Sequence, residues 1–137
     1  MPGMDAASGL ADLRRAEALS PKVLYALDAR FTRSSPVTDV AQLTSLASAA
    51  VAAGRGHVLD TSHVIFPNGA ITLVLILAES HLSIHTWPEE DLIAIDLFSC
   101  GAIDGEAVIS GLTRSLRLDG VSVRRLSRGA PRGHAGG

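Results

Sequence analysis

The amino-acid sequence predicts an α+β fold in which an antiparallel or mixed sheet carries two helices on one face. Its 137 residues are enough for one domain with a single core. Six segments are strand-like and only two have helical spacing, in the order β-α-β-β-β-β-α-β. Two helices cannot cover both faces of so many strands, so the helices are expected on one face and the other face is left to be covered.

The first part of the chain is expected to hold an extension, a strand and a helix. Residues 1–20 suit a short amphipathic helix or a loosely held N-terminal extension. Residues 22–31 alternate as a strand does. The clearest helix spans residues 36–53, where apolar side chains recur at helical spacing and Ser35 or Thr38 can cap the first turn.

The remaining elements follow in close succession. Turn residues such as those at 67–69, Pro-Asn-Gly, separate the middle strands, because proline fixes one dihedral and Asn-Gly accepts a positive φ. A single domain is therefore expected over residues 21–127, followed by a flexible tail at 128–137 that lacks an apolar anchor. The predicted strands span residues 56–66, 70–78, 82–86, 91–99 and 121–126, and the second helix spans residues 104–118.

Composition limits the partners and the compartment. Hydrophobic residues make up 47% of the chain and aromatic residues only 4%, so aliphatic side chains must fill the core. A formal charge of −2 gives no overall attraction to nucleic acid or to an anionic membrane. The longest strongly apolar run, residues 70–78, is far shorter than the roughly 20 residues that cross a bilayer. The single cysteine and the lack of a signal-peptide pattern predict a reducing, cytoplasmic location.

Ser80 is the candidate nucleophile. It follows Glu79 between two apolar segments, and a serine hydroxyl needs a positioned base or a strained carbonyl before it reacts. On composition alone, Ser80 would be an ordinary turn residue. The interpretation as a nucleophile therefore depends on the residues around it.

His85 and Cys100 are the candidate proton-transfer groups. An imidazole exchanges protons near neutrality, although a strand histidine is more often without a chemical role. A thiol can donate a proton, although buried cysteines usually act as small apolar residues. In an unbroken strand, residues 80 and 85 would point to opposite faces, so we expect a turn or bulge between them, near Ser80 and His81.

A metal site is the competing interpretation of the histidines. His81 and His85 share strand parity and His63 could approach them. No fourth ligand lies at a spacing typical of metal sites, so no metal is predicted.

Two motifs resemble the prokaryotic S-adenosylmethionine decarboxylase family. They are Glu-Ser-His-Leu-Ser-Ile-His-Thr-Trp-Pro-Glu at residues 79–89 and Ala-Ile-Asp-Leu-Phe-Ser-Cys-Gly at residues 94–101. The resemblance implies the α/β sandwich of that family and self-cleavage between Glu79 and Ser80 into fragments 1–79 and 80–137. It also implies a pyruvoyl cofactor made from Ser80, which would bind the substrate amine as a Schiff base and accept electrons when carbon dioxide leaves.

The same resemblance implies a role for each matching residue. Ser80 would be the pyruvoyl precursor, His85 the proton acceptor in processing and Cys100 the proton donor in catalysis. The family also uses a hydroxyl eight residues before the cleavage serine. The remaining assignments are Thr72 for assistance in processing and Phe66, Leu82 and Glu89 for substrate binding.

The resemblance further implies a homodimer with its sheets in contact, acting on S-adenosylmethionine in spermidine synthesis. Two alternatives stay open at this stage. The substrate could be another amino acid, such as ornithine or arginine, because the strand at 22–31 and the turn after Phe66 depart from the family pattern. A non-catalytic homologue acting as a regulatory subunit is the third hypothesis, and the joint presence of Ser80, His85 and Cys100 argues against it.

Overall fold

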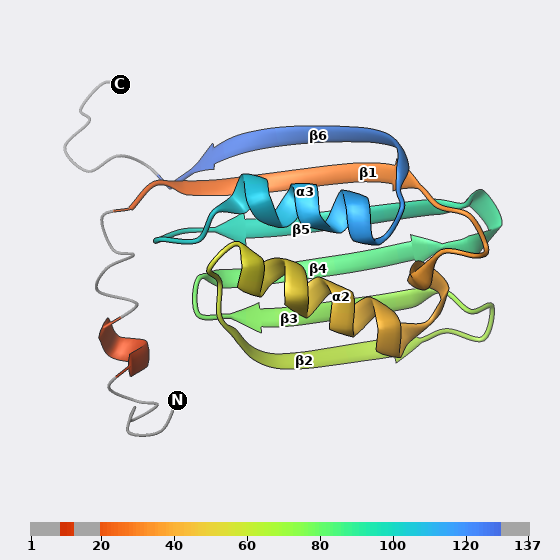
Figure 1. The fold of residues 1–137 in the computed structure, drawn as a ribbon, viewed down its shortest axis with the longest axis horizontal. Helices are drawn as coiled ribbons and strands as arrows, with labels where there is room; N and C mark the ends of the chain where they lie inside the picture. The colour runs from red at the N-terminus through yellow and green to blue at the C-terminus, as the bar shows by residue number, and fades with distance from the viewer. Residues whose placement is uncertain (1–8, 13–19, 130–137) are drawn as a thin grey trace.

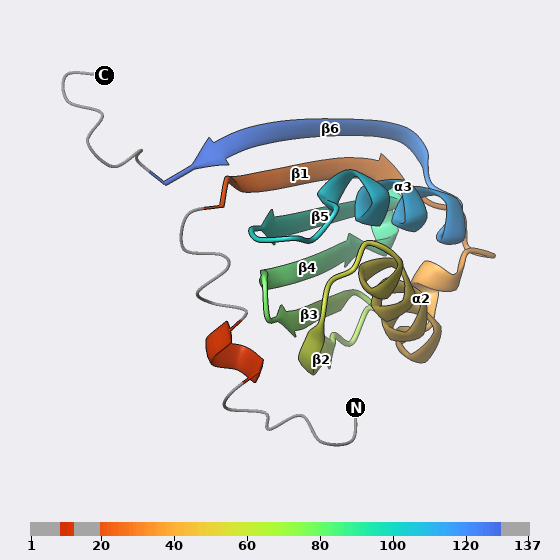
Figure 2. The same cartoon turned by 60° about the vertical axis from the view of Figure 1, so that its left-hand side comes forward.

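The computed structural model describes residues 9–12 and 20–129, and they form the predicted α+β fold. One six-stranded sheet has the order β2-β3-β4-β5-β1-β6, and every neighbouring pair is antiparallel. Both long helices lie on the same face of this sheet (Figures 1 and 2). Most of the predicted N-terminal extension and nearly all of the predicted tail lie outside the described residues.

The four inner strands alternate between buried and more accessible side chains, as a sheet with one covered face requires, whereas the two edge strands are accessible along most of their length. The strands are β1 (Lys22–Arg30), β2 (Val58–Ile65), β3 (Ile71–Leu77), β4 (Ser80–Trp87), β5 (Leu92–Ser99) and β6 (Asp119–Arg128). The helices are α2 (Val40–Ala53) and α3 (Gly105–Ser115), with short 3-10 turns η1 (Pro36–Thr38) and η2 (Pro88–Glu90).

Two of the differences from the predicted boundaries have a clear physical cause. The helix expected over residues 36–53 is divided, because Asp39 is extended and its carboxylate accepts hydrogen bonds from the first backbone N–H groups of α2. Ser35 therefore caps only η1. The last strand is longer than expected, because β6 pairs with β1 as far as Arg128, which the prediction had assigned to the tail.

The core lies between the sheet and the two helices. Leu73, Leu75, Ile84 and Ile95 are fully buried there. Burial of such a side chain contributes about 1.5–3 kcal/mol, so these strands are held firmly in place. Further core residues from the helices include Leu43, Val51, Val108 and Leu112.

The opposite face of the sheet carries no helix in the part of the chain that the structure describes, and we call it the open face (Figure 2). It mixes small, polar and apolar groups at the alternate strand positions. Its central side chains are Leu24, Ala26, Thr72, Val74, Ile76, His81, Ser83, His85, Ala94, Asp96 and Phe98.

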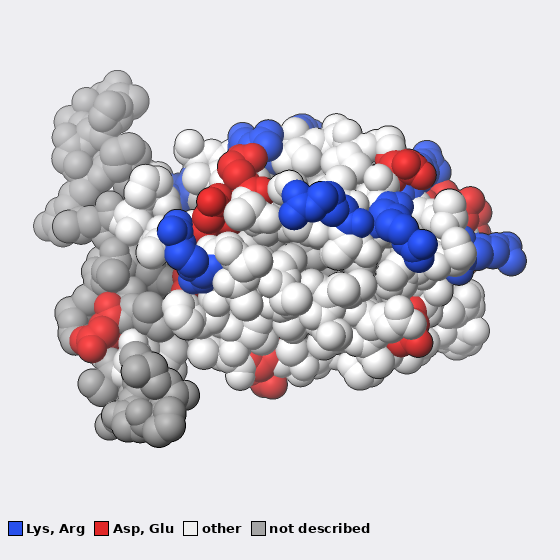
Figure 3. Space-filling view, in the orientation of Figure 1, with Lys and Arg blue, Asp and Glu red and all other residues white. Residues whose placement is uncertain are grey.

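The helix-bearing face differs in charge between its two halves. Helix α2 contains no Lys, Arg, Asp or Glu, and the surface over it is mostly uncharged (Figure 3). Charges of both signs gather instead around α3 and its ends, where Glu106 forms a two-bond ion pair with Arg125. Among the described residues, no helix has the length and apolar character needed to cross a membrane.

Candidate active site

The turn between β3 and β4 holds the predicted cleavage position. Leu77 pairs directly with Ser80, so Ala78 and Glu79 form a two-residue hairpin turn. Ser80 has φ = 133°, a conformation that residues with a Cβ rarely adopt. Such a conformation costs on the order of 1–3 kcal/mol and tends to occur at functional sites. The peptide bond between Glu79 and Ser80 therefore lies in a strained segment.

Cys100 lies beside this turn. Strands β4 and β5 are neighbours, with His81 opposite Phe98, so the end of β5 reaches the start of β4. The Cys100 thiol donates a hydrogen bond to the Glu79 carbonyl oxygen at 3.2 Å, and its sulfur lies 3.7 Å from Ser80 Oγ. A hydroxyl, a carbonyl and a thiol thus meet at one end of the sheet, and we call these three residues the Ser80 cluster.

The side chain of Glu79 binds a different partner from the one that binds its carbonyl. It is only 3% exposed, and its two oxygens bind the backbone N–H of His57 at 2.9 Å and the His57 ring nitrogen Nδ1 at 2.6 Å. Sequence reasoning missed His57, because it lies 22 residues before Glu79 and belongs to no motif. A burial pattern alone could not have indicated this contact.

A second cluster lies towards the other end of β4. Thr72 Oγ1 and His85 Nδ1 are 3.2 Å apart on the open face, as their paired positions on β3 and β4 require. Both line a pocket of about 540 Å³ together with Phe66 and Trp87, two residues that are 45% and 40% exposed. We call these four residues the His85 cluster.

The two clusters are far apart within one protomer. Strand β4 runs without a register shift from Ser80 to Trp87, so the bulge expected near Ser80 and His81 is absent. The irregularity is confined to the positive φ of Ser80. Five residues of strand span about 16 Å. His85 therefore does not reach Ser80 along its own strand.

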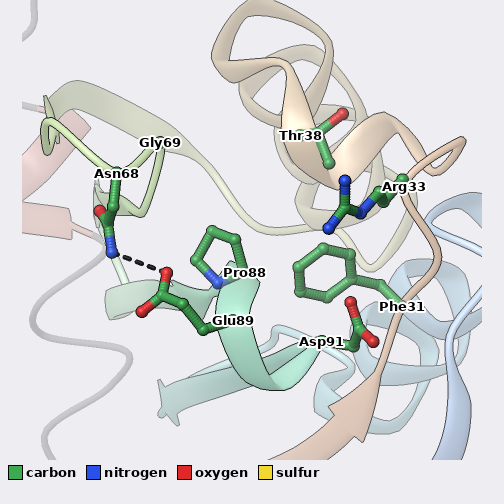
Figure 4. Close-up of a pocket in the computed structure, with 8 residues that line it drawn as sticks. All are labelled: Phe31, Arg33, Thr38, Asn68, Gly69, Pro88, Glu89 and Asp91. Carbon is green, nitrogen blue, oxygen red and sulfur yellow. Dashed lines mark hydrogen bonds between the residues drawn. The ribbon is translucent and has the colours of Figure 1, made fainter.

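Glu89 borders the His85 cluster. It lies in η2 directly after β4, and its carboxylate accepts a hydrogen bond from Asn68 Nδ2 at 2.8 Å. Figure 4 shows Glu89 and Asn68 on one side of a second pocket of about 560 Å³, with Pro88 between them and Phe31. Asn68 lines both pockets, so Glu89 faces the surface next to Phe66 and Thr72 and lies far from Ser80.

Leu82 does not fit a substrate contact through its side chain. It has no exposed surface and is packed in the core beneath the helices. Leu82 lies between the open-face residues His81 and Ser83 and therefore points to the covered face of β4, which sequence spacing alone could not distinguish from the site.

Comparison with known proteins places the chain in a family. Residues 24–129 match the family model described as S-adenosylmethionine decarboxylase. The chain belongs to the S-adenosylmethionine decarboxylase family. The resemblance drawn from the two motifs is thereby confirmed.

Individual relatives of this decarboxylase family agree with that assignment. The chain is 37% identical over 105 residues to the S-adenosylmethionine decarboxylase proenzyme of Symbiobacterium thermophilum, covering 76% of this chain and 80% of that protein. It is 39% identical over 74 residues to S-adenosylmethionine decarboxylase proenzyme 2 of Bacillus anthracis, covering 53% of this chain. The matched segment spans 60% of the length of the Bacillus relative.

The fold also matches a solved structure. The crystal structure of the adenosylmethionine decarboxylase from Aquifex aeolicus superposes with a TM-score of 0.70, at 23% identity, over 85% of this chain and 97% of that chain. This chain therefore shares the fold of that Aquifex protein.

In this member of the family, the histidines do not gather as a metal site would require. His63 pairs with Leu73, which points to the covered face, whereas His85 lies on the open face. The His81 ring packs against Phe98 at a centroid distance of 6.2 Å. Within residues 9–12 and 20–129, no three potential ligands are grouped.

Proposed function

We propose that the chain is a self-cleaving proenzyme that matures into a pyruvoyl-dependent S-adenosylmethionine decarboxylase, producing decarboxylated S-adenosylmethionine for spermidine synthesis. The observation that carries this proposal is the Ser80 cluster. A hydroxyl, the carbonyl of the preceding residue and a thiol lie within hydrogen-bonding range at a strained turn. Family membership and the relatives named proenzymes support it.

Cleavage would begin with attack of Ser80 Oγ on the Glu79 carbonyl carbon. The peptide bond is replaced by an ester, and the amino group of residue 80 is released. The positive φ of Ser80 is strain that ester formation can relieve.

Elimination would then break the ester bond. A base removes the Cα proton of residue 80, and the Glu79 carboxylate leaves as the new C-terminus of fragment 1–79. Water replaces the nitrogen, ammonia is released, and residue 80 becomes a pyruvoyl group. The residues present fit this product, because the turn places the new group beside the Cys100 thiol.

The pyruvoyl group would supply an electron-accepting carbonyl for the substrate amine. Cys100 is the protein group placed to return a proton to the substrate carbon after carbon dioxide departs. It is 5% exposed, so bulk water has little access to that step. This role requires a reduced thiol, in keeping with a cytoplasmic enzyme.

The separation of the two clusters favours a homodimer. His85 cannot reach Ser80 across about 16 Å of its own strand, because proton transfer needs approach to about 3 Å. If a second copy packs antiparallel on the open face, its His85 cluster approaches the first copy's Ser80 cluster. Each site would then combine Ser80 and Cys100 of one protomer with the other protomer's Thr72 and His85.

The His85 cluster provides a site for the substrate. Its pocket of about 540 Å³ lies within the range of small-molecule sites, and the exposed face of Phe66 can stack on an adenine ring. Glu89, held by Asn68, offers a carboxylate at the border of the same pocket.

Intact mass spectrometry tests the proposal. The wild-type protein should give two fragments, 1–79 and 80–137, the second with a blocked N-terminus, whereas Ser80→Ala should give one uncut, inactive chain. Carbon dioxide release should then be measured with S-adenosylmethionine, ornithine and arginine. A full-length wild-type mass with decarboxylase activity would refute pyruvoyl chemistry. A preference for ornithine or arginine would refute S-adenosylmethionine as the substrate.

A further inference from the structure

The loop before β2 is hydrogen-bonded to the cleavage turn through His57. The His57 backbone N–H and ring Nδ1 bind the two carboxylate oxygens of Glu79, at 2.9 and 2.6 Å. The His57 carbonyl accepts the backbone N–H of Ala78 at 2.9 Å. Three hydrogen bonds therefore join His57 to both residues of the hairpin turn.

The direction of the ring contact depends on the tautomer of His57. An ionised carboxylate can only accept hydrogen bonds, so the tautomer that binds a Glu79 carboxylate carries its proton on Nδ1. Short hydrogen bonds to a charged group are the stronger kind. The His57 side chain is itself 56% exposed, so its remaining nitrogen can face solvent while Nδ1 holds the buried Glu79.

The loop that carries His57 is itself held firmly. A Cβ on Gly56 would come within 2.7 Å of the Ile103 and Val51 side chains, which shows how closely the backbone is packed there. The carbonyl of Gly54 accepts the backbone N–H of Asp104 at 2.8 Å. The loop is therefore bonded both to the cleavage turn and to the segment that follows Cys100.

We propose that His57 is a positioning residue for self-cleavage. By fixing the Glu79 side chain, it orients the Glu79 carbonyl between the Ser80 hydroxyl and the Cys100 thiol. His57 binds the Glu79 side chain and the backbone of Ala78, so its effect on the Glu79 carbonyl is transmitted through the turn itself. Misplacement of reacting atoms by about 1 Å can cost on the order of 100-fold in rate, so this orientation has kinetic weight.

The inference rests on the proposed cleavage between Glu79 and Ser80, and one experiment separates the two ideas. Full-length chains would be made by cell-free synthesis with a pulse label, and cleavage would be followed by gel and intact mass. His57→Phe keeps the ring but removes the donor, whereas His57→Asn keeps an N–H donor at a similar reach. We expect cleavage of His57→Phe to be about 10- to 100-fold slower than wild type, and His57→Asn to regain most of the rate.

A merely structural role is tested in an uncleavable background. The unfolding temperatures of Ser80→Ala and His57→Phe/Ser80→Ala should be close to each other, although wild type and His57→Phe differ in cleavage rate. Equal cleavage rates for wild type and His57→Phe would overturn the role of His57 and leave the proposed function standing. An uncut wild-type chain would overturn both.

A double-mutant cycle covers the case in which His57→Phe also destabilises the fold. Glu79→Gln replaces one acceptor oxygen with an amide group, so it should disturb the same contact. Combined with His57→Phe, it should slow cleavage little more than the larger single effect. Fully multiplicative effects would show that His57 and Glu79 act independently, and would overturn the proposal.

Discussion

The strongest test of a shared site is complementation between two inactive chains. A His85→Ala chain keeps a normal Ser80, and a Ser80→Ala chain keeps a normal His85. Each should process poorly alone, because loss of a general acid-base group costs about 10²- to 10⁴-fold and loss of the nucleophile abolishes the reaction. In a mixed dimer, His85 of the Ser80→Ala chain would lie over Ser80 of the His85→Ala chain.

The structure sets the size of the expected effect. Along β4, residues 80 and 85 are about 16 Å apart, whereas a general base must approach to about 3 Å. Rescue within one chain is therefore geometrically impossible without breaking the pairing of β4. With random assembly of equal amounts, about half of the His85→Ala chains enter mixed dimers, so about half of them should become cleavable.

The assay uses co-expressed chains with different tags, separated after denaturation and weighed by mass spectrometry. Cleavage should appear only in the chain that carries Ser80, and light scattering should give a dimer mass. A control mixture of His85→Ala with Ser80→Ala/His85→Ala should remain uncut. If the His85→Ala chain stays uncut beside Ser80→Ala in a confirmed mixed dimer, the trans arrangement is refuted.

Three further outcomes are expected. Cys100→Ala should cleave largely normally but release carbon dioxide about 10²- to 10⁴-fold more slowly per cleaved chain. A wild-type turnover rate in this variant would show that Cys100 has only a packing role in the core. In the Ser80→Ala background, Leu82→Ala should lower the free energy of unfolding by about 2–5 kcal/mol, because Leu82 is fully buried. Leu59 is half-exposed, so Leu59→Ala should lower the free energy of unfolding far less. Both values would be measured by urea titration. The hydrogen bond from Arg125 lowers the pKa of Glu106, so the pair stabilises the fold above the unfolded value near 4.5. The small loss of unfolding free energy caused by Glu106→Gln at pH 7 should therefore fade as the pH falls below the lowered pKa. A difference between the variant and its parent that stays constant down to pH 3 would contradict this prediction.

The fold could be predicted because local patterns and global packing agree. Alternating strands such as β3 and β5 show which face is covered, and two helices are too few to cover both. The meeting of Ser80 with Cys100 also follows from neighbouring antiparallel strands, with β4 and β5 paired from His81 onwards. Asp39 was missed as the cap of α2, because Ser35 and Thr38 offered competing caps nearby.

The geometry inside the site was less predictable, for two physical reasons. Parity shows that residues 80 and 85 cannot share a face, but it does not show how the chain resolves the conflict. The chain leaves β4 regular and places the strain in the φ of Ser80, so His85 stays with Thr72. The contact from His57 depends on the path of a loop, which carries no periodic signal.

The position of the cut within the sheet order decides how the matured protein holds together. Fragment 1–79 would contribute β1, β2 and β3, and fragment 80–137 would contribute β4, β5 and β6. Three of the five strand pairings in the described sheet, β3 with β4, β1 with β5 and β1 with β6, would join one fragment to the other. Strand β1 lies between β5 and β6, so the two polypeptides produced by the proposed cleavage would be interlocked (Figure 1). Neither fragment could dissociate without breaking the strand pairing on both sides of β1. The two fragments would therefore behave as one cooperative unit and would not exchange with free fragments.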